Sequence, residues 1–296
     1  MNYDQFNDII INLKRPLILD GAMGSLIQQK GLSVDKNIWA TKYNFTNPQL
    51  IINIHKSYIE SGCDLISTNT FRTNPNALKF SQYSNSETVK NTVELAKRAV
   101  KEYDFQNDKR AIMIAGVNAP AEDCYQKDVT ISKYSIEENH KQHISMLYEF
   151  GADIILNETQ SHFDEIKFIS KFCSQNKIPF IISIFVTEQL NILSGESLKD
   201  TLTMIKKYSP NLISFNCISQ KIFYKILSEI DLSFNWGFYL NCGSGELTDK
   251  NISCGLSPLE YSEIVKYSLK FNPKLIGACC GSNPHHISKI KNLLYE

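Results

Sequence analysis

Short apolar runs alternate along this chain with longer amphipathic stretches. Eight runs have the near-continuous apolar character of strands covered on both faces of a parallel sheet, at residues 16–20, 64–70, 111–117, 153–157, 179–186, 211–217, 236–242 and 274–279. Between them, apolar residues recur at helical spacing, at residues 48–61, 87–103, 136–150, 162–175, 198–208, 220–230, 258–271 and 284–294. In the clearest helix Asn47 is the cap, Pro48 takes the first position and Gly62 follows the end. The alternation predicts an α/β fold with a parallel sheet.

Eight strands alternating with eight helices is the count of a (β/α)8 barrel, so we expect residues 1–296 to form a single TIM barrel domain. The repeats from the second strand to the fourth each exceed 40 residues. They predict long loops at the rim where barrel active sites are built. A doubly wound open sheet would show the same alternation, but the turn from Asp20 to Ser25 lacks its G-x-G-x-x-G fingerprint. Gly21 and Gly24 instead suit a tight turn whose backbone amides face a ligand.

Charge and composition indicate a small-molecule partner. The 296 residues include 31 basic and 31 acidic ones, a net charge of zero, so no overall field attracts nucleic acid or an anionic membrane. Neither a signal peptide nor an apolar stretch of membrane-spanning length is recognisable. Eight cysteines without a secretion signal indicate reduced thiols and a cytoplasmic location. We interpret five of them as structural or incidental: Cys63, Cys124, Cys173, Cys242 and Cys254.

The other three cysteines are placed to hold one metal ion. Cys217 ends the sixth predicted strand, and the pair Cys279-Cys280 ends the eighth, so all three project from the same rim. Soft thiolates favour zinc over hard cations, and three protein ligands leave a fourth position for substrate. Gly281 allows the backbone to turn so that the two adjacent side chains converge. The pattern predicts a catalytic Zn2+ site; a buried, non-ligating Cys217 is the simpler alternative.

The histidines predict no second metal site. His140 and His143 are three residues apart on one helix face, but no carboxylate cluster accompanies them, and we expect a solvated face. His285 and His286 follow Pro284 at the start of the last helix. We expect both to lie at the surface or the rim.

Six motifs stand at strand ends in chain order. They are Leu19-Asp20-Gly21-Ala22-Met23-Gly24, Thr68-Asn69-Thr70-Phe71, Asn157-Glu158-Thr159, Phe215-Asn216-Cys217, Asn241-Cys242-Gly243 and the segment from Gly277-Ala278-Cys279-Cys280-Gly281 to Ile287. Together they resemble the homocysteine S-methyltransferases that have a zinc-thiolate barrel domain, over nearly the whole chain. Ala278 and Cys242 depart from the residues common in that family, but both are small. The resemblance implies a Zn2+-dependent barrel that binds homocysteine and methylates its sulfur, which gives methionine.

The chemistry of the residues agrees with this resemblance. A free alkyl thiol has a pKa of roughly 8.5, and only its thiolate is a good nucleophile. Coordination to zinc deprotonates it. Asp20 and Glu158 are candidates to accept hydrogen bonds from the ammonium group of homocysteine, and the amides from Gly21 to Ser25 are candidates for its carboxylate. A helix-capping role would also explain Asp20.

Two more substrate-site residues are expected at strand ends. Thr70, beside Asn69, is expected to line the pocket, although a buried hydrogen-bonding role would explain it equally. Asn241 is a candidate for the fourth zinc position when homocysteine is absent, as the resemblance suggests.

The methyl donor is left open by the sequence. The chain ends a few residues after its last predicted helix, so we expect no cobalamin or folate domain of its own. This favours a small free donor, S-methylmethionine or another sulfonium. The alternatives are betaine or a separate methyl-corrinoid protein as partner. Aromatic residues near the rim are candidates to hold a cationic donor by cation–π contact: Trp39, Tyr43, Phe71 and Tyr125. A non-catalytic zinc- or thiol-binding module is a further alternative. Thiol-redox chemistry at Cys279-Cys280 is disfavoured because the usual two-residue spacing is missing.

Overall fold

The structure is a computed structural model that describes residues 1–103, 110–244 and 252–295. Its eight-stranded parallel sheet has the order β1-β10-β7-β6-β5-β4-β3-β2. These strands are β1 Leu17–Ile18, β2 Leu65–Ser67, β3 Met113–Asn118, β4 Ile154–Gln160, β5 Phe180–Ile184, β6 Leu212–Asn216, β7 Trp236–Leu240 and β10 Leu275–Ala278. A bridge from Leu19 to Leu65 joins the two ends of the sheet and closes the barrel. The predicted (β/α)8 TIM barrel is therefore confirmed.

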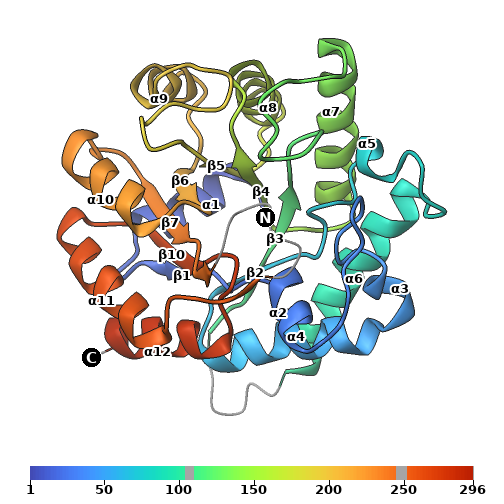
Figure 1. Cartoon of the computed structure of the whole chain (residues 1–296), viewed down its shortest axis with the longest axis horizontal. Helices are drawn as coiled ribbons and strands as arrows, with labels where there is room; N and C mark the ends of the chain where they lie inside the picture. Colours follow the sequence, from blue (N-terminus) through green and yellow to red (C-terminus); the bar gives the residue numbers. More distant parts are fainter. Residues whose placement is uncertain (104–109, 245–251, 296) are drawn as a thin grey trace.

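Helices surround the barrel, as Figure 1 shows. They are α2 Gly24–Gln29, α3 Tyr43–Thr46, α4 Pro48–Ser61, α5 Pro75–Leu78, α6 Asn85–Glu102, α7 Lys133–Glu149, α8 Phe163–Gln175, α9 Leu198–Lys206, α10 Gln220–Glu229, α11 Pro258–Ser268 with the 3-10 turn Leu269–Phe271, and α12 Pro284–Tyr295. The α4 helix has the predicted ends: the Asn47 side chain accepts from Leu50 N, Pro48 follows it, and Gly62 adopts a left-handed φ of 106°. None of the helices in the described ranges is long and apolar enough to cross a bilayer.

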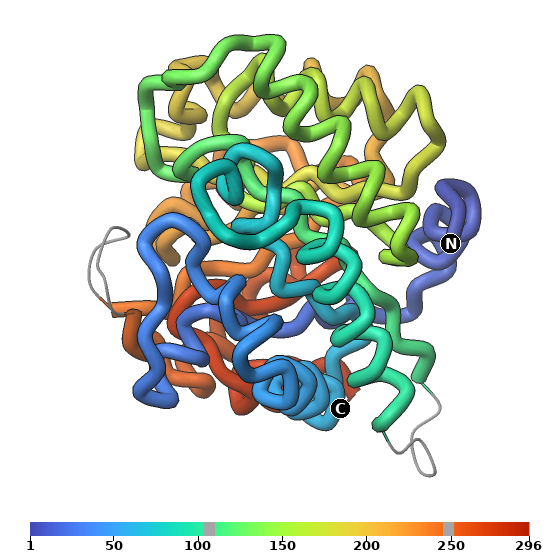
Figure 2. Tube along the Cα trace, turned by 90° about the vertical axis from the view of Figure 1, so that its right-hand side faces the viewer, coloured from blue at the N-terminus to red at the C-terminus, as the bar shows by residue number. Residues whose placement is uncertain are grey.

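Four helices in the described ranges were not predicted from the sequence: the short α2, α3 and α5, which lie in the loops after β1 and β2, and the N-terminal α1. The helix α1, Tyr3–Ile11, begins at an Asn2 capping box and lies at one end of the barrel (Figure 2). Its buried residues Phe6 and Ile10 belong to the same apolar cluster as inward-facing residues of the strands, among them Leu17, Met113 and Leu275. The helix therefore closes the end of the barrel where the strands begin. This leaves the opposite end for ligands, in agreement with the general rule for barrels.

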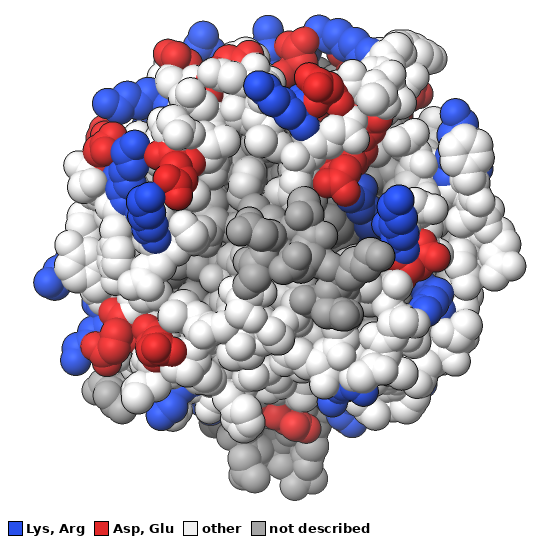
Figure 3. Space-filling view, in the orientation of Figure 1, with Lys and Arg blue, Asp and Glu red and all other residues white. Residues whose placement is uncertain are grey.

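The loops that follow β2 and β3 are long, as predicted, and so is the loop that follows β1. The loop after β1 carries α2 and α3, the loop after β2 carries α5, and residues 119–132 follow β3. A small antiparallel hairpin, β8 Gly243–Ser244 with β9 Ser253–Cys254, lies after β7. On the face seen in Figure 3, basic and acidic side chains are mixed around the periphery. No one sign of charge dominates the visible described surface of this face, in keeping with a net charge of zero.

Candidate active site

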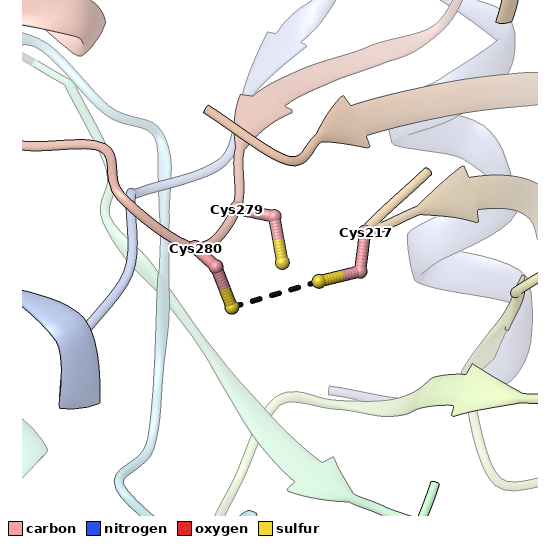
Figure 4. Close-up of side chains that lie close together, drawn as sticks. All are labelled: Cys217, Cys279 and Cys280. Carbon is pink, nitrogen blue, oxygen red and sulfur yellow. Dashed lines mark hydrogen bonds between the residues drawn. The ribbon is translucent and has the colours of Figure 1, made fainter. Parts of the chain in front are cut away.

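Three thiols meet at the end of the barrel opposite α1. The sulfur atoms of Cys217, Cys279 and Cys280 all lie within 4.8 Å of one another, and Figure 4 shows the three side chains converging from two separate strand ends. The Sγ atoms of Cys217 and Cys280 are 3.5 Å apart. Cys217 and Cys279 are buried, whereas Cys280 is partly exposed. The predicted grouping of these residues is present, and the group could hold a metal ion through soft ligands.

The backbone at both strand ends is shaped to bring the thiols together. Cys217 directly follows β6 and has a φ of 55°, a left-handed conformation that is uncommon for a residue other than glycine. Gly281 has a φ of 80°, and a Cβ atom there would come within 2.4 Å of the Gly243 backbone. The turn after Cys280 therefore requires glycine for its conformation and for its close packing.

The electrostatics of the thiol cluster favour ionisation of one member. Hydrogen bonds from Cys279 and Cys280 hold the pKa of Cys217 well below its usual range. The Tyr125 hydroxyl, in the loop after β3, also donates to Cys217 Sγ at 3.1 Å. The tyrosine ring packs edge-on against Phe185. The sequence indicated Tyr125 only as a rim aromatic, because its contact with a cysteine 92 residues away arises only in the folded barrel.

Two carboxylates lie near the thiols without a cationic partner. Glu158, on β4, follows the inward-facing Ile154 and Leu156 in the alternation of the strand. Burial raises its pKa to about 8, and the negative charges of Cys217 and Asp20 add to this shift. Burial also raises the pKa of Asp20 to about 7. Among the described ion pairs, none involves either carboxylate.

The Asp20 carboxylate joins β1 to β2. It accepts hydrogen bonds from Ser67 N at 2.8 Å and from the Ser67 hydroxyl. The side chain makes no capping bond to the following helix, whose cap residue is Met23. Gly21 next to it is closely packed, since an added Cβ would lie 2.8 Å from Ser282 Oγ and from the Tyr58 ring. The Ala22 amide, one of the predicted carboxylate donors, already donates to Ser282 Oγ at 3.0 Å.

The remaining predicted site residues use their polar groups within the fold. The Thr70 hydroxyl is buried and donates to Val117 O at 2.7 Å, while Thr68 Oγ1 lies 2.7 Å away. The Asn241 side-chain oxygen accepts from Gly243 N at 2.8 Å. Both residues stand at strand ends beside the site, but in this state their hydrogen bonds stabilise loops. Their roles toward substrate and metal stay predictions.

The prediction for the histidines was wrong at three positions. His140 and His143 are fully buried rather than solvated. His140 Nε2 lies 2.5 Å from Glu165 Oε1, and His143 Nδ1 lies 2.9 Å from Asn118 Oδ1. The partners come from β3 and α8, so the pattern of α7 alone does not reveal them. His286 is also buried, with Nε2 2.8 Å from Leu256 O, while His285 is exposed as expected.

Comparison with known sequences decides the family. A sequence profile of the family described as homocysteine S-methyltransferase matches residues 17–294. The chain belongs to this family. The match includes all eight barrel strands and the three clustered cysteines, so the homocysteine S-methyltransferase family accounts for the whole barrel.

Relatives in plants and bacteria are similar over nearly their full length. The chain is 22% identical to homocysteine S-methyltransferase 2 of Arabidopsis thaliana, over 99% of this chain and 98% of the relative. It is 24% identical to homocysteine S-methyltransferase of Escherichia coli strain K12, over 93% and 94% of the two chains. The crystal structure of the metallated form of the homocysteine methyltransferase MmuM from Escherichia coli has the same fold. It superposes with a TM-score of 0.82 at 21% identity, over 97% of this chain and 99% of that one.

Proposed function

We propose that this protein transfers a methyl group from a small donor to the sulfur of homocysteine and so forms methionine. The observation that carries the proposal is the thiol cluster of Cys217, Cys279 and Cys280 beside two carboxylates, the half-buried Glu158 and the buried Asp20. The three thiols could hold a metal ion that binds the substrate as a thiolate, and the carboxylates could accept hydrogen bonds from the substrate ammonium group. Family membership supports the same reaction.

Zinc is the metal that fits these residues. Three sulfur ligands within 4.8 Å of one another match the soft donor set that selects Zn2+ over Mg2+ or Ca2+. Cys217, Cys279 and Cys280 would hold the ion, and Asn241 is the candidate for its fourth position before substrate arrives. When bound, Zn2+ supplies the positive charge that keeps the substrate thiol deprotonated at neutral pH.

The protein's own residues orient the amino acid part of homocysteine. We infer that Glu158 accepts hydrogen bonds from the substrate ammonium group, with Asp20 adding negative charge behind it. Gly21 allows the turn after β1 to pack closely against Ser282 and Tyr58, and the Thr70 hydroxyl fixes the loop after β2 beside the proposed substrate site. A cation in this place would relieve the unfavourable burial that raises the pKa values of the two carboxylates.

A sulfonium such as S-methylmethionine is the donor we favour. Its leaving group is a neutral sulfide, so the transfer needs no general acid. Its positive charge suits the negative surroundings of the thiol cluster. Betaine and a separate methyl-corrinoid protein are the alternatives.

A donor screen tests the proposal. The zinc-loaded protein is incubated with homocysteine and, in separate reactions, S-methylmethionine, S-adenosylmethionine, betaine and a methyl-corrinoid protein, and methionine is measured by mass spectrometry. We expect methionine with a sulfonium donor. Methionine from none of the donors, with homocysteine still bound, would instead favour the non-catalytic zinc- or thiol-binding module.

Metal analysis tests the ligands separately. We expect about one zinc per purified chain, and loss of that zinc from the serine variants of Cys217, Cys279 and Cys280. Cys173→Ser is the matched control, because Cys173 is a buried cysteine on α8 outside the thiol cluster. Full zinc content in all three ligand variants would show that the assignment is wrong.

A further inference from the structure

One buried hydroxyl group in the barrel interior has no partner. Tyr239, on β7, is 2% exposed, and no described residue forms a hydrogen bond of normal geometry with its Oη atom. Buried hydroxyls are seldom left unpaired in native proteins, and each exception requires an explanation such as a bound water or ligand. Tyr239 belongs to the interior cluster that also contains Leu156, Cys217 and Cys279. The Cys217 amide also donates to Tyr239 O at 3.1 Å, and the charge of Glu158 acts on the phenol, so Tyr239 lies beside the proposed substrate site.

Two neighbours of the Tyr239 hydroxyl, Ser183 and Glu158, lie close enough for a weak polar interaction that affects pKa values, but neither forms a hydrogen bond of normal geometry with it. Ser183 lies near it, but the Ser183 hydroxyl already donates to Asn216 Oδ1 at 2.9 Å and accepts from Ser214 Oγ at 2.7 Å. Glu158 is the other neighbour. Burial raises the pKa of Tyr239 well above its usual value, and the charge of Glu158 raises it further. The phenol therefore stays protonated beside a carboxylate, with its oxygen lone pairs unused.

Two other buried tyrosines of the barrel, Tyr261 and Tyr58, form hydrogen bonds through their hydroxyl groups. The Tyr261 hydroxyl donates to Gly277 O at 2.5 Å and accepts from Leu240 N at 3.1 Å. The Tyr58 hydroxyl donates to Ala22 O at 2.8 Å. Tyr239 differs from these two tyrosines because its hydroxyl lacks a hydrogen-bond partner among the described residues, and its phenol lies near Glu158.

We propose that Tyr239 is a substrate-binding residue whose hydroxyl oxygen accepts a hydrogen bond from the α-ammonium group of the thiol substrate, alongside Glu158. This inference rests on the proposed function, since it takes an α-amino thiol as the substrate. An ammonium group has three donors, so it can bond to the carboxylate and to the phenol oxygen at once. A substrate carboxylate in the same place would face the like charge of Glu158, which disfavours it. Tyr239 therefore contributes to selecting thiols that have an amino group.

Paired changes in protein and ligand test this contact. The zinc-loaded wild type and Tyr239→Phe are titrated calorimetrically with homocysteine and with 4-mercaptobutyrate, which is homocysteine without its amino group. We expect Tyr239→Phe to weaken homocysteine binding about ten-fold, the range of one hydrogen bond to a charged group. Binding of 4-mercaptobutyrate should change less than about two-fold.

Stability of the metal-free protein provides the second readout. Tyr239→Phe removes a hydroxyl that has no partner, so the variant should unfold at the same or a higher urea concentration than the wild type. Tyr261→Phe is the matched control and should unfold earlier, because it leaves Gly277 O and Leu240 N without their partner. A purely structural role for Tyr239 would make both variants less stable and would overturn the inference.

The remaining outcomes are also decisive. Equal losses of affinity for homocysteine and for 4-mercaptobutyrate would show that the phenol shapes the site without contacting the ammonium group. Unchanged homocysteine affinity would show that Tyr239 does not belong to the substrate site. If Tyr239→Phe failed to fold, a crystal structure of the wild type with homocysteine would decide by the distance from Tyr239 Oη to the ligand nitrogen. A wild type that binds no homocysteine would overturn the proposed function and this inference together, whereas the other results affect Tyr239 alone.

Discussion

Glu158 is the residue whose surroundings differ most from those of an ordinary surface carboxylate. It stands at the end of an apolar strand, and its pKa is raised to about 8 by burial and by nearby negative charge. Such a group gains most from a cation that enters the site, because the cation removes the cost of burying its charge. The substrate ammonium group is the cation that the proposed reaction brings.

Glu158→Gln tests this role while keeping the size of the side chain. Loss of a charge-assisted hydrogen bond worth roughly 1.5–3 kcal/mol should weaken homocysteine binding about ten-fold or more. Zinc content should not change. Glu188→Gln is the control, because Glu188 is an exposed carboxylate paired with Lys221. Equal homocysteine affinity of Glu158→Gln and the wild type in calorimetry would remove Glu158 from the ammonium site.

Gly281 offers a second test at the scale of one residue. Gly281→Ala would force a Cβ against the Gly243 backbone and so displace the turn that holds Cys279 and Cys280. Gly31→Ala is a close control, since Gly31 has a similar φ of 79° and open space around it. We expect Gly31→Ala to cost about 1–2 kcal/mol of stability and keep its zinc. Gly281→Ala should lose zinc, as measured by metal analysis, and zinc retained in both variants would contradict the packing argument.

The helix α1 closes the barrel at the end remote from the thiols. Phe6 is fully buried in the interior cluster, so Phe6→Ala should reduce the free energy of unfolding by about 3–5 kcal/mol. Ile11, on the same helix, is 67% exposed, and Ile11→Ala should change the free energy of unfolding by less than about 0.5 kcal/mol. Urea unfolding measures both. The KM for homocysteine should stay unchanged in Phe6→Ala, and a large rise would show that the two ends of the barrel are coupled.

Strands and their order along the chain were predictable from the sequence, whereas contacts between distant segments were not. The apolar runs predicted all eight barrel strands, since strands buried on both faces leave a clear local signal. The helix α1 escaped prediction because it buries only Phe6 and Ile10, and the adjacent Ile9 and Ile11 blur that stripe. His140 and His143 were misplaced because Asn118 and Glu165, which allow their burial, are 22 and 25 residues from His140. Tyr239 carried no signal, since an inward tyrosine on a strand has the pattern of a core residue.

For the molecule as a whole, the buried carboxylate of Asp20 predicts a dependence of stability on pH. The pKa of Asp20 is about 7 in the fold, against an ordinary value of 3.8. Between these two pKa values the folded state keeps a proton that the unfolded state has lost. The contribution of Asp20 to the free energy of unfolding therefore decreases as the pH rises from about 4 to about 7.

Asp20→Asn should remove that decrease. An asparagine can still accept from Ser67 N and can donate to the Ser67 hydroxyl, so the contact between β1 and β2 is kept. The free energy of unfolding of the metal-free variant minus that of the metal-free wild type should be larger at pH 7.5 than at pH 5, by roughly 2 kcal/mol. Urea midpoints at the two pH values measure this difference. Parallel changes in the two proteins would show that Asp20 does not titrate in this range.

The thiol cluster also has a consequence for biosynthesis. Cys217 follows the sixth barrel strand, whereas Cys279 and Cys280 follow β10, the strand that pairs with β1 and so completes the ring. A nascent chain still on the ribosome contains only one of the three thiols until the strand that completes the barrel has been translated. The proposed metal site can therefore form only after the last barrel strand has been made, and a translation product truncated before Cys279 would lack two of its three thiols.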